Sequence, residues 1–80
     1  MKLLLVEDSV RLQRSLSLGL KKQGFTVDQA FDGEEALSCI AHSDYDAIVL
    51  DLMLPKLDGF SLCRELRRRG RTTPILMQNE

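Results

Sequence analysis

Three short apolar runs constrain the fold of this chain most strongly, because none of them alternates apolar with polar residues. They begin at Leu3, Ala47 and Ile75, and each has a charged or polar residue or a proline on either side. Strands that are buried on both faces of a parallel sheet have this pattern. Together with a more polar run, typical of a sheet edge, they predict four strands, at residues 2–6, 25–30, 47–52 and 74–77.

A helix is predicted between the first two of these strands. Ser9 can cap its first turn, and Gly24 can stop it after about Gln23. Its buried stripe is expected to consist of leucines four residues apart, namely Leu12, Leu16 and Leu20. Leu18 lies off this stripe, and we expect it to be available for a contact with another molecule.

Two further helices are predicted between the remaining strands. The first opens at Asp32, because Glu35 stands three residues later and completes a capping box. Its inner face comprises Ala36, Leu37 and Ile40. The other follows a loop at 53–57 that contains Pro55, is capped by Asp58 and ends at Gly70. Its inward side chains are predicted to be Phe60, Leu62, Cys63 and Leu66.

Strands that alternate with helices predict an α/β fold, with a parallel sheet, right-handed crossovers and helices on both faces. Eighty residues form one domain at most, and the hydrophobic fraction of 44% is ordinary for a globular chain. A net charge of −1 gives no general reason to bind nucleic acid or an anionic membrane. We therefore interpret the arginines near the end of the chain as a solvated helix face and loop: Arg64, Arg67, Arg68, Arg69 and Arg71.

The sequence also argues against a targeting or membrane segment. The first apolar run is interrupted at Glu7, whereas a signal peptide needs roughly 7–15 apolar residues. No segment approaches the ~20 apolar residues that span a bilayer. Cys39 and Cys63 lie on apolar helix faces without metal-ligand spacing, so we expect buried, reduced thiols. A cytoplasmic location is expected.

Acidic side chains follow two of the predicted strands at their carboxyl ends. Glu7 and Asp8 end the first strand, and Asp51 stands near the end of the third. If these strands are neighbours in a parallel sheet, the three carboxylates converge at one edge, where such sheets bind ligands. One such acid would merely mark the chain emerging into water. Acids after two strands favour a functional site.

The chemistry of three convergent carboxylates favours a magnesium ion. Close carboxylates repel each other, and a hard divalent cation with oxygen ligands removes that repulsion. No histidine or thiolate stands beside them, and His42 is expected at the surface near a helix end, which argues against zinc. A carboxylate beside magnesium can attack phosphorus and form an acyl phosphate. The chain is too short to form a sugar cleft for glycoside hydrolysis.

Four segments of the chain closely resemble the receiver domain of bacterial two-component response regulators: LLLVEDS, FDGEEAL, IVLDLMLPKLDGF and TTPILM. The segments DLMLPKLDG and PILM are most similar in sequence to receivers of the winged-helix transcription-factor branch. The resemblance covers all but the last three residues. It implies a three-layer flavodoxin-like sheet with strand order 2-1-3-4, the start of the family's 2-1-3-4-5.

The resemblance implies a role for each matching residue. Asp51 is the phosphoacceptor, and Asp8 and Asp51 ligate Mg²⁺ or Mn²⁺ directly. Glu7 contributes directly or through water, and the backbone carbonyl of Met53 adds a further ligand. The phosphodonor would be a phosphohistidine on a sensor histidine kinase, or a small phosphodonor. The kinase would dock on the first helix and adjoining loops, around Arg11, Leu12 and Pro55.

The family pattern continues well beyond the residues that match it. Its strand-four hydroxyl aligns with Asn79, whose amide can also donate a hydrogen bond. Several features of the family have no counterpart in residues 1–80. These are the fifth strand with its lysine, two further helices, the switch aromatic residue and the DNA-binding domain. We therefore expect residues 1–80 to be the N-terminal part of one receiver domain, with weak phosphotransfer and no direct DNA binding.

A receiver that ends inside its fourth strand is expected to leave apolar surface uncovered. We expect Leu4 and Val49, or their neighbours, to meet water, and the fourth strand to be an open edge. Several hundred Å² of such surface forfeits several kcal/mol at ~25 cal/mol per Å². The fragment is thus predicted to form a homodimer or another self-assembly, or to fold poorly alone.

Three interpretations of the function remain open from the sequence. The first is a phosphoacceptor module of a two-component pathway, which is no enzyme beyond its own phosphorylation. The second is a non-catalytic interaction module that docks on a kinase or on a full-length partner. The third is an engineered fragment or a cleavage product without an independent role.

Overall fold

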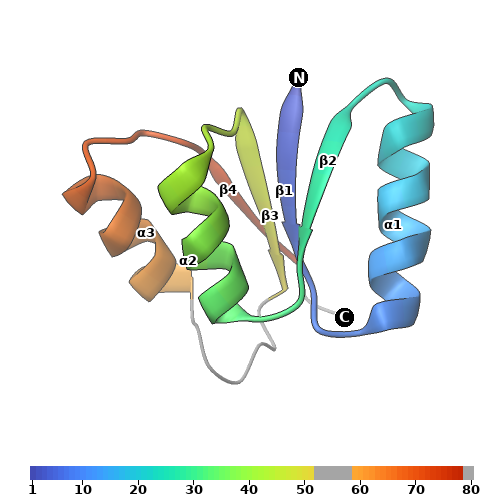
Figure 1. Ribbon diagram of the computed structural model, residues 1–80, viewed down its shortest axis with the longest axis horizontal. Helices are drawn as coiled ribbons and strands as arrows, with labels where there is room; N and C mark the ends of the chain where they lie inside the picture. Colours follow the sequence, from blue (N-terminus) through green and yellow to red (C-terminus); the bar gives the residue numbers. More distant parts are fainter. Residues whose placement is uncertain (52–58, 79–80) are drawn as a thin grey trace.

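The computed structural model describes residues 1–51 and 59–78 of the chain (Figure 1). Its strands are β1 (Lys2–Val6), β2 (Thr26–Ala30), β3 (Ala47–Asp51) and β4 (Ile75–Gln78). Its helices are α1 (Val10–Lys22), α2 (Gly33–His42) and α3 (Gly59–Arg68). The predictions for Leu52, Met53, Pro55, Asp58 and Asn79 fall outside the described residues.

The four strands form one parallel sheet in the order β2-β1-β3-β4. The central strands β1 and β3 pair from Leu3 opposite Ala47 to Val6 opposite Leu50. Helix α1 lies on one face of the sheet, and α2 and α3 lie on the other (Figure 1). The predicted flavodoxin-like α/β architecture is therefore confirmed, and so is its strand order.

The ends of α1 follow from the residues that flank it. The Ser9 hydroxyl accepts a hydrogen bond from the Leu12 amide at 3.3 Å, which satisfies one free donor of the first turn. Gly24 has φ +97°, a left-handed conformation that favours glycine over residues with a side chain. The amide of Phe25 then donates to the Leu20 carbonyl at 3.2 Å and closes the last turn.

The start of α2 and the end of α3 resemble the corresponding ends of α1. The Asp32 carboxylate accepts from the Glu35 amide at 2.8 Å, and the Glu35 carboxylate accepts from the Phe31 amide at 2.8 Å. The capping pair is therefore confirmed, although Glu35 reaches one residue further back than in a capping box. After α3, Gly70 has φ +73°, and the Arg71 amide donates to the Leu66 carbonyl at 2.9 Å.

The face of the sheet under α2 and α3 is closed and apolar. Alternate side chains of the central strands point to it, and all of them are inaccessible to water: Leu4, Val6, Ile48 and Leu50. The helices contribute Ala36, Ile40, Leu62 and Leu66, as predicted. Because both helices pack over this face, the expectation that Leu4 meets water is wrong.

The face under α1 is more polar and less completely covered. The predicted leucine stripe of Leu12, Leu16 and Leu20 is only half-buried, and the fully buried side chains of α1 are Gln13 and Ser17. One helix covers a four-stranded sheet here, so the leucines flank the line of closest contact while the smaller polar residues occupy it. The apolar pattern located the helix but not its innermost residues.

Three other burial predictions, for Phe60, Val49 and the cysteines, are corrected by the structure. Phe60 was expected to point inward, yet it is 79% exposed. It precedes the buried Leu62 by two residues, which places it on the opposite side of α3. Val49 was expected to meet water but is only 6% exposed, although it lines an apolar groove together with Leu16 and Leu76. Cys39 and Cys63 are free thiols, as expected, but half-buried.

Candidate acidic site at the carboxyl ends of β1 and β3

The structure brings together the three acids that the sequence singled out. Strand β1 ends at Val6, opposite Leu50 of β3, so Glu7 and Asp8 leave the sheet beside Asp51. One carboxylate oxygen from each of the three side chains lies within 4.8 Å of the other two. Residues more than forty positions apart in the chain thus share one site, because parallel strands finish at one edge.

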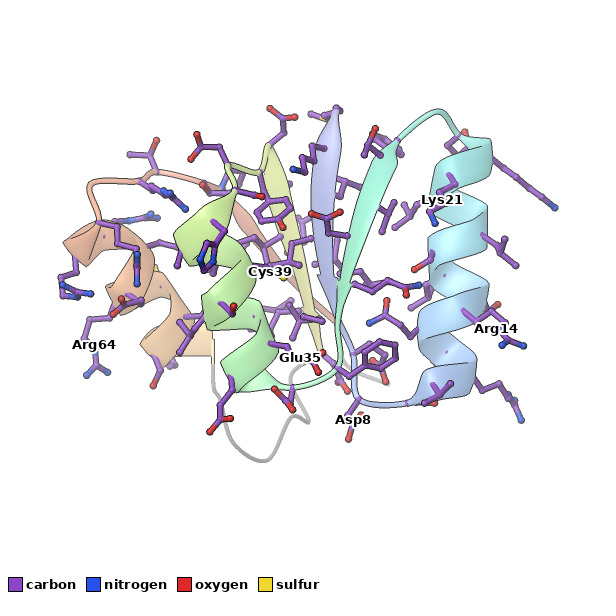
Figure 2. The ribbon with its side chains drawn as sticks, in the orientation of Figure 1. Asp8, Arg14, Lys21, Glu35, Cys39 and Arg64 are labelled. Atoms are coloured by element: carbon purple, nitrogen blue, oxygen red, sulfur yellow. The ribbon has the colours of Figure 1, made fainter. Side chains whose placement is uncertain are left out.

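The three carboxylates differ in their exposure to water. Glu7 and Asp51 are buried, with 2% and 4% of their surface exposed, whereas Asp8 is exposed. Figure 2 shows Asp8 where β1 passes into α1, with its side chain directed away from the body of the molecule. The site therefore combines two carboxylates that are shielded from water with a third that water can reach.

Backbone contacts hold Glu7 in this position. Its amide donates to the Ala30 carbonyl at 3.0 Å, which extends the pairing of β1 with β2 by one bond. Its carboxylate accepts from the Ser9 amide at 3.2 Å. The buried amide of Gln13 also donates to the Glu7 carbonyl at 3.3 Å. Ser9 thus contacts the acidic site as well as capping α1.

The donor set fits a hard divalent cation. Carboxylate oxygens are the ligands that Mg²⁺ prefers, and a cation removes the repulsion between acids held this close. Within residues 1–51 and 59–78, this is the one group of three or more acidic, histidine or cysteine side chains with ligand atoms so close together. The fourth ligand that the sequence suggested, the Met53 carbonyl, lies outside those residues.

Histidine takes no part in the described site. His42 is exposed at the last residue of α2, where its Nδ1 lies 2.8 Å from the Ser38 carbonyl oxygen. The prediction of a surface histidine at a helix end is confirmed. Donors in the group are therefore oxygen only, which favours magnesium or manganese over zinc.

The arginines near the end of the chain have structural contacts. Arg68 and Arg69 bond the Glu65 carboxylate, and the hydrogen bond from Arg68 holds the pKa of Glu65 down at about 2. Arg71 is half-buried, which corrects its interpretation as a solvated residue. It donates to the carbonyls of Ile40 and Ser43 at the end of α2. Its guanidinium therefore joins α2 to the segment before β4.

No helix in the described parts of the chain is both long and apolar enough to cross a membrane.

Comparisons with known proteins agree with this architecture. The family model of the response regulator receiver domain matches residues 3–79. The transcriptional regulatory protein TcrA of Mycobacterium tuberculosis is 45% identical over 76 residues, which are 95% of this chain and 30% of TcrA. The chain thus spans about a third of the length of such relatives.

Solved structures give the same result. The receiver domain of a Francisella response regulator superimposes with a TM-score of 0.87 at 36% identity, over 98% of this chain and 64% of that one. The response regulator TrrA of Thermotoga maritima, solved in complex with Mg²⁺–BeF, gives 0.86 at 28% identity, over 98% and 68%.

The matched family explains why acidic residues stand at the carboxyl ends of β1 and β3. Receiver domains bind Mg²⁺ through acidic residues, are not conventional enzymes, and belong to regulators that partner with sensor histidine kinases. The family match extends over nearly the whole chain, and the fold and the position of the acids agree with it. This chain belongs to the receiver domain family of two-component response regulators.

Proposed function

We propose that the chain accepts a phosphoryl group on Asp51 in a magnesium-dependent reaction. The observation that carries the proposal is the convergence of Glu7, Asp8 and Asp51 within 4.8 Å. Asp8 and Asp51 would ligate the cation directly, and Glu7 directly or through water. Mn²⁺ presents the same preference for oxygen ligands and would substitute. When bound, the cation supplies charge neutralisation for the phosphoryl oxygens.

The step itself is a displacement at phosphorus. A carboxylate oxygen of Asp51 forms a bond to the phosphorus atom as the phosphorus–nitrogen bond of a phosphohistidine breaks. The product is an acyl phosphate on Asp51, and the released imidazole takes a proton from water. Burial of Asp51 strengthens the electrostatic interactions at the site, because surrounding apolar atoms replace water.

The donor is proposed to be a sensor histidine kinase in the cytoplasm. Its docking surface would be the exposed start of α1 with the adjoining loops, because α1 begins at Val10, directly after the acidic residues Glu7 and Asp8. Arg11 is exposed there, and Leu12 is half-buried. The parent regulator is proposed to control transcription, as the name of TcrA suggests for that relative.

The phosphoacceptor proposal is tested by intact mass spectrometry after incubation with Mg²⁺ and a small phosphodonor such as acetyl phosphate. We expect one phosphoryl adduct on the wild-type chain and none on Asp51→Asn, because the amide is not nucleophilic. The matched control is Asp44→Asn, an exposed aspartate before β3, which should keep the adduct. An adduct that persists in Asp51→Asn would contradict the proposal.

A second candidate function is self-association, favoured by an apolar groove on the α1 face. The groove measures about 340 Å³ and is lined by Met1, Leu3, Leu5, Leu16, Leu20, Phe25, Ala47, Val49 and Leu76. Leu76 is 60% exposed on β4, which is an edge strand among the described residues. A second copy would cover the groove and pair with that edge.

Light scattering separates this candidate from a monomeric phosphoacceptor. A particle mass above 9.1 kDa that survives Asp51→Ala and falls in Leu76→Lys supports association through the groove. A compact monomer at all concentrations contradicts it.

A further inference from the structure

Gln13 occupies an unusual place for a polar side chain. It lies on the first half of α1, between the helix and the sheet, and none of its surface is exposed. Its neighbour Arg14, in contrast, points from α1 into solvent (Figure 2). Because burying an amide costs free energy unless its polar atoms are bonded, the contacts of Gln13 indicate what it does there.

The side-chain nitrogen of Gln13 contacts three backbone carbonyls at the ends of β1 and β2. It lies 3.1 Å from the Leu5 oxygen, 3.3 Å from the Glu7 oxygen and 3.0 Å from the Ala30 oxygen. Two N–H groups are shared among these three acceptors. The contacts fall where β1 and β2 end, beside the Glu7 amide that already pairs with Ala30.

A second set of hydrogen bonds fixes the orientation of this amide. Its oxygen accepts from the Ser17 hydroxyl at 3.2 Å, one turn further along α1. That hydroxyl in turn accepts from the side-chain amide of Gln29 on β2 at 2.8 Å. With its oxygen engaged by Ser17, the nitrogen of Gln13 points to the strand ends, so the flipped orientation is disfavoured.

We propose that Gln13 is a positioning residue for the acidic site. By holding the Glu7 carbonyl against the end of β2, its amide fixes the peptide unit between Glu7 and Asp8 and thereby the directions of both carboxylates. The inference rests on the proposed function, because the directions of the Glu7 and Asp8 carboxylates affect function only through the cation that they bind. Gln13 itself contacts none of the expected ligand atoms. Residues that orient metal ligands in this way typically change metal affinity by about 10–100-fold when removed.

The main test replaces Gln13 with methionine, which has similar length and volume but no N–H donor. Mg²⁺ is titrated into ¹⁵N-labelled protein, and the dissociation constant is read from the amide resonances of the folded population. We expect the dissociation constant to rise about tenfold in Gln13→Met. The matched control is Val27→Ala, another buried change on the α1 face, which should stay within twofold of wild type. An unchanged constant in Gln13→Met overturns the proposal.

A second measurement without metal separates this proposal from the phosphoacceptor proposal. Hydrogen exchange of the Glu7 amide reports directly on its bond to Ala30. We expect exchange at Glu7 to accelerate at least tenfold more in Gln13→Met than in Val27→Ala, relative to the global unfolding of each variant. If wild type binds no Mg²⁺, the proposed magnesium-dependent function is rejected. The hydrogen-exchange rate of the Glu7 amide still decides whether Gln13 fixes the end of β1.

A milder variant covers the case in which Gln13→Met does not fold. Ser17→Ala removes the group that orients the Gln13 amide but leaves the amide in place. We expect changes in the same direction, about threefold in each measurement. Wild-type values in Ser17→Ala, with Gln13→Met unfolded, count against a positioning role.

Discussion

The two faces of the sheet differ in how they are covered, although the same strands supply both. Under α2 and α3, the alternate side chains of β1 and β3 are fully buried in one apolar cluster. Under α1, buried polar side chains run beside an apolar groove that remains open to water. The closed face therefore contributes most of the stability, whereas the α1 face positions the acidic site and offers a surface for partners.

The largest effect expected from this comparison is the loss of a side chain on the closed face. Ile48→Ala leaves a cavity beneath α2 and α3 and should lower the free energy of unfolding by about 2–5 kcal/mol. Leu16→Ala, on the half-covered face, should cost about 1 kcal/mol because part of that side chain already contacts water.

Urea denaturation of both variants measures the difference directly. If Ile48→Ala leaves too little folded protein, Ile48→Val should still cost about 1 kcal/mol. Equal losses for Ile48→Ala and Leu16→Ala would show that the two faces contribute alike, contrary to the comparison.

A smaller effect is expected at Tyr45, which lies at the edge of the closed face. Its hydroxyl donates to the Asp28 carboxylate at 2.7 Å, and Lys2 lies over its ring at 5.2 Å from the centroid. Tyr45→Phe should cost about 1 kcal/mol near neutral pH, less than a buried hydrogen bond to a charged group contributes, because the Asp28 side chain is 40% exposed.

The stability difference at Tyr45 should depend on pH in a defined direction. Burial, and then the bond to Asp28, raise the pKa of Tyr45 above its ordinary value of 10.0. Because the folded state keeps this proton longer than the unfolded chain does, the stabilisation is complete below about pH 10 and falls as pH rises further. The gap between wild type and Tyr45→Phe should therefore narrow above pH 10. A constant gap from pH 8 to 11 would contradict this assignment.

Much of the acidic site was predictable from the sequence. Glu7, Asp8 and Asp51 each follow an apolar run, and parallel strands of this length can end only at a common edge. Ser9, Asp32 and the glycines after α1 and α3 marked the helix ends by local chemistry, which needs no tertiary information. The acidic site and the helix ends could therefore be predicted, because each depends on a short sequence pattern with a known physical cause.

The burial of particular side chains could not be predicted in the same way. The spacing of Leu12, Leu16 and Leu20 defines an apolar stripe, but the contact line of α1 runs through Gln13 and Ser17. The burial of Gln13 depends on carbonyls at the ends of two strands, and that of Ser17 on the side chains of Gln13 and Gln29. These partners lie together only in the folded sheet. A glutamine four residues before a serine, within an otherwise apolar face, was the one available signal.

The central claim is that Glu7, Asp8 and Asp51 bind one divalent cation together. Isothermal titration of Mg²⁺ into wild type, Asp8→Asn and Asp51→Asn tests it most directly, with Asp44→Asn at the opposite end of β3 as control. We predict binding at one site in wild type and in the control, and a loss of affinity of about tenfold or more in each site variant. Equal Mg²⁺ affinity in all four proteins, or no binding to wild type, would contradict the account.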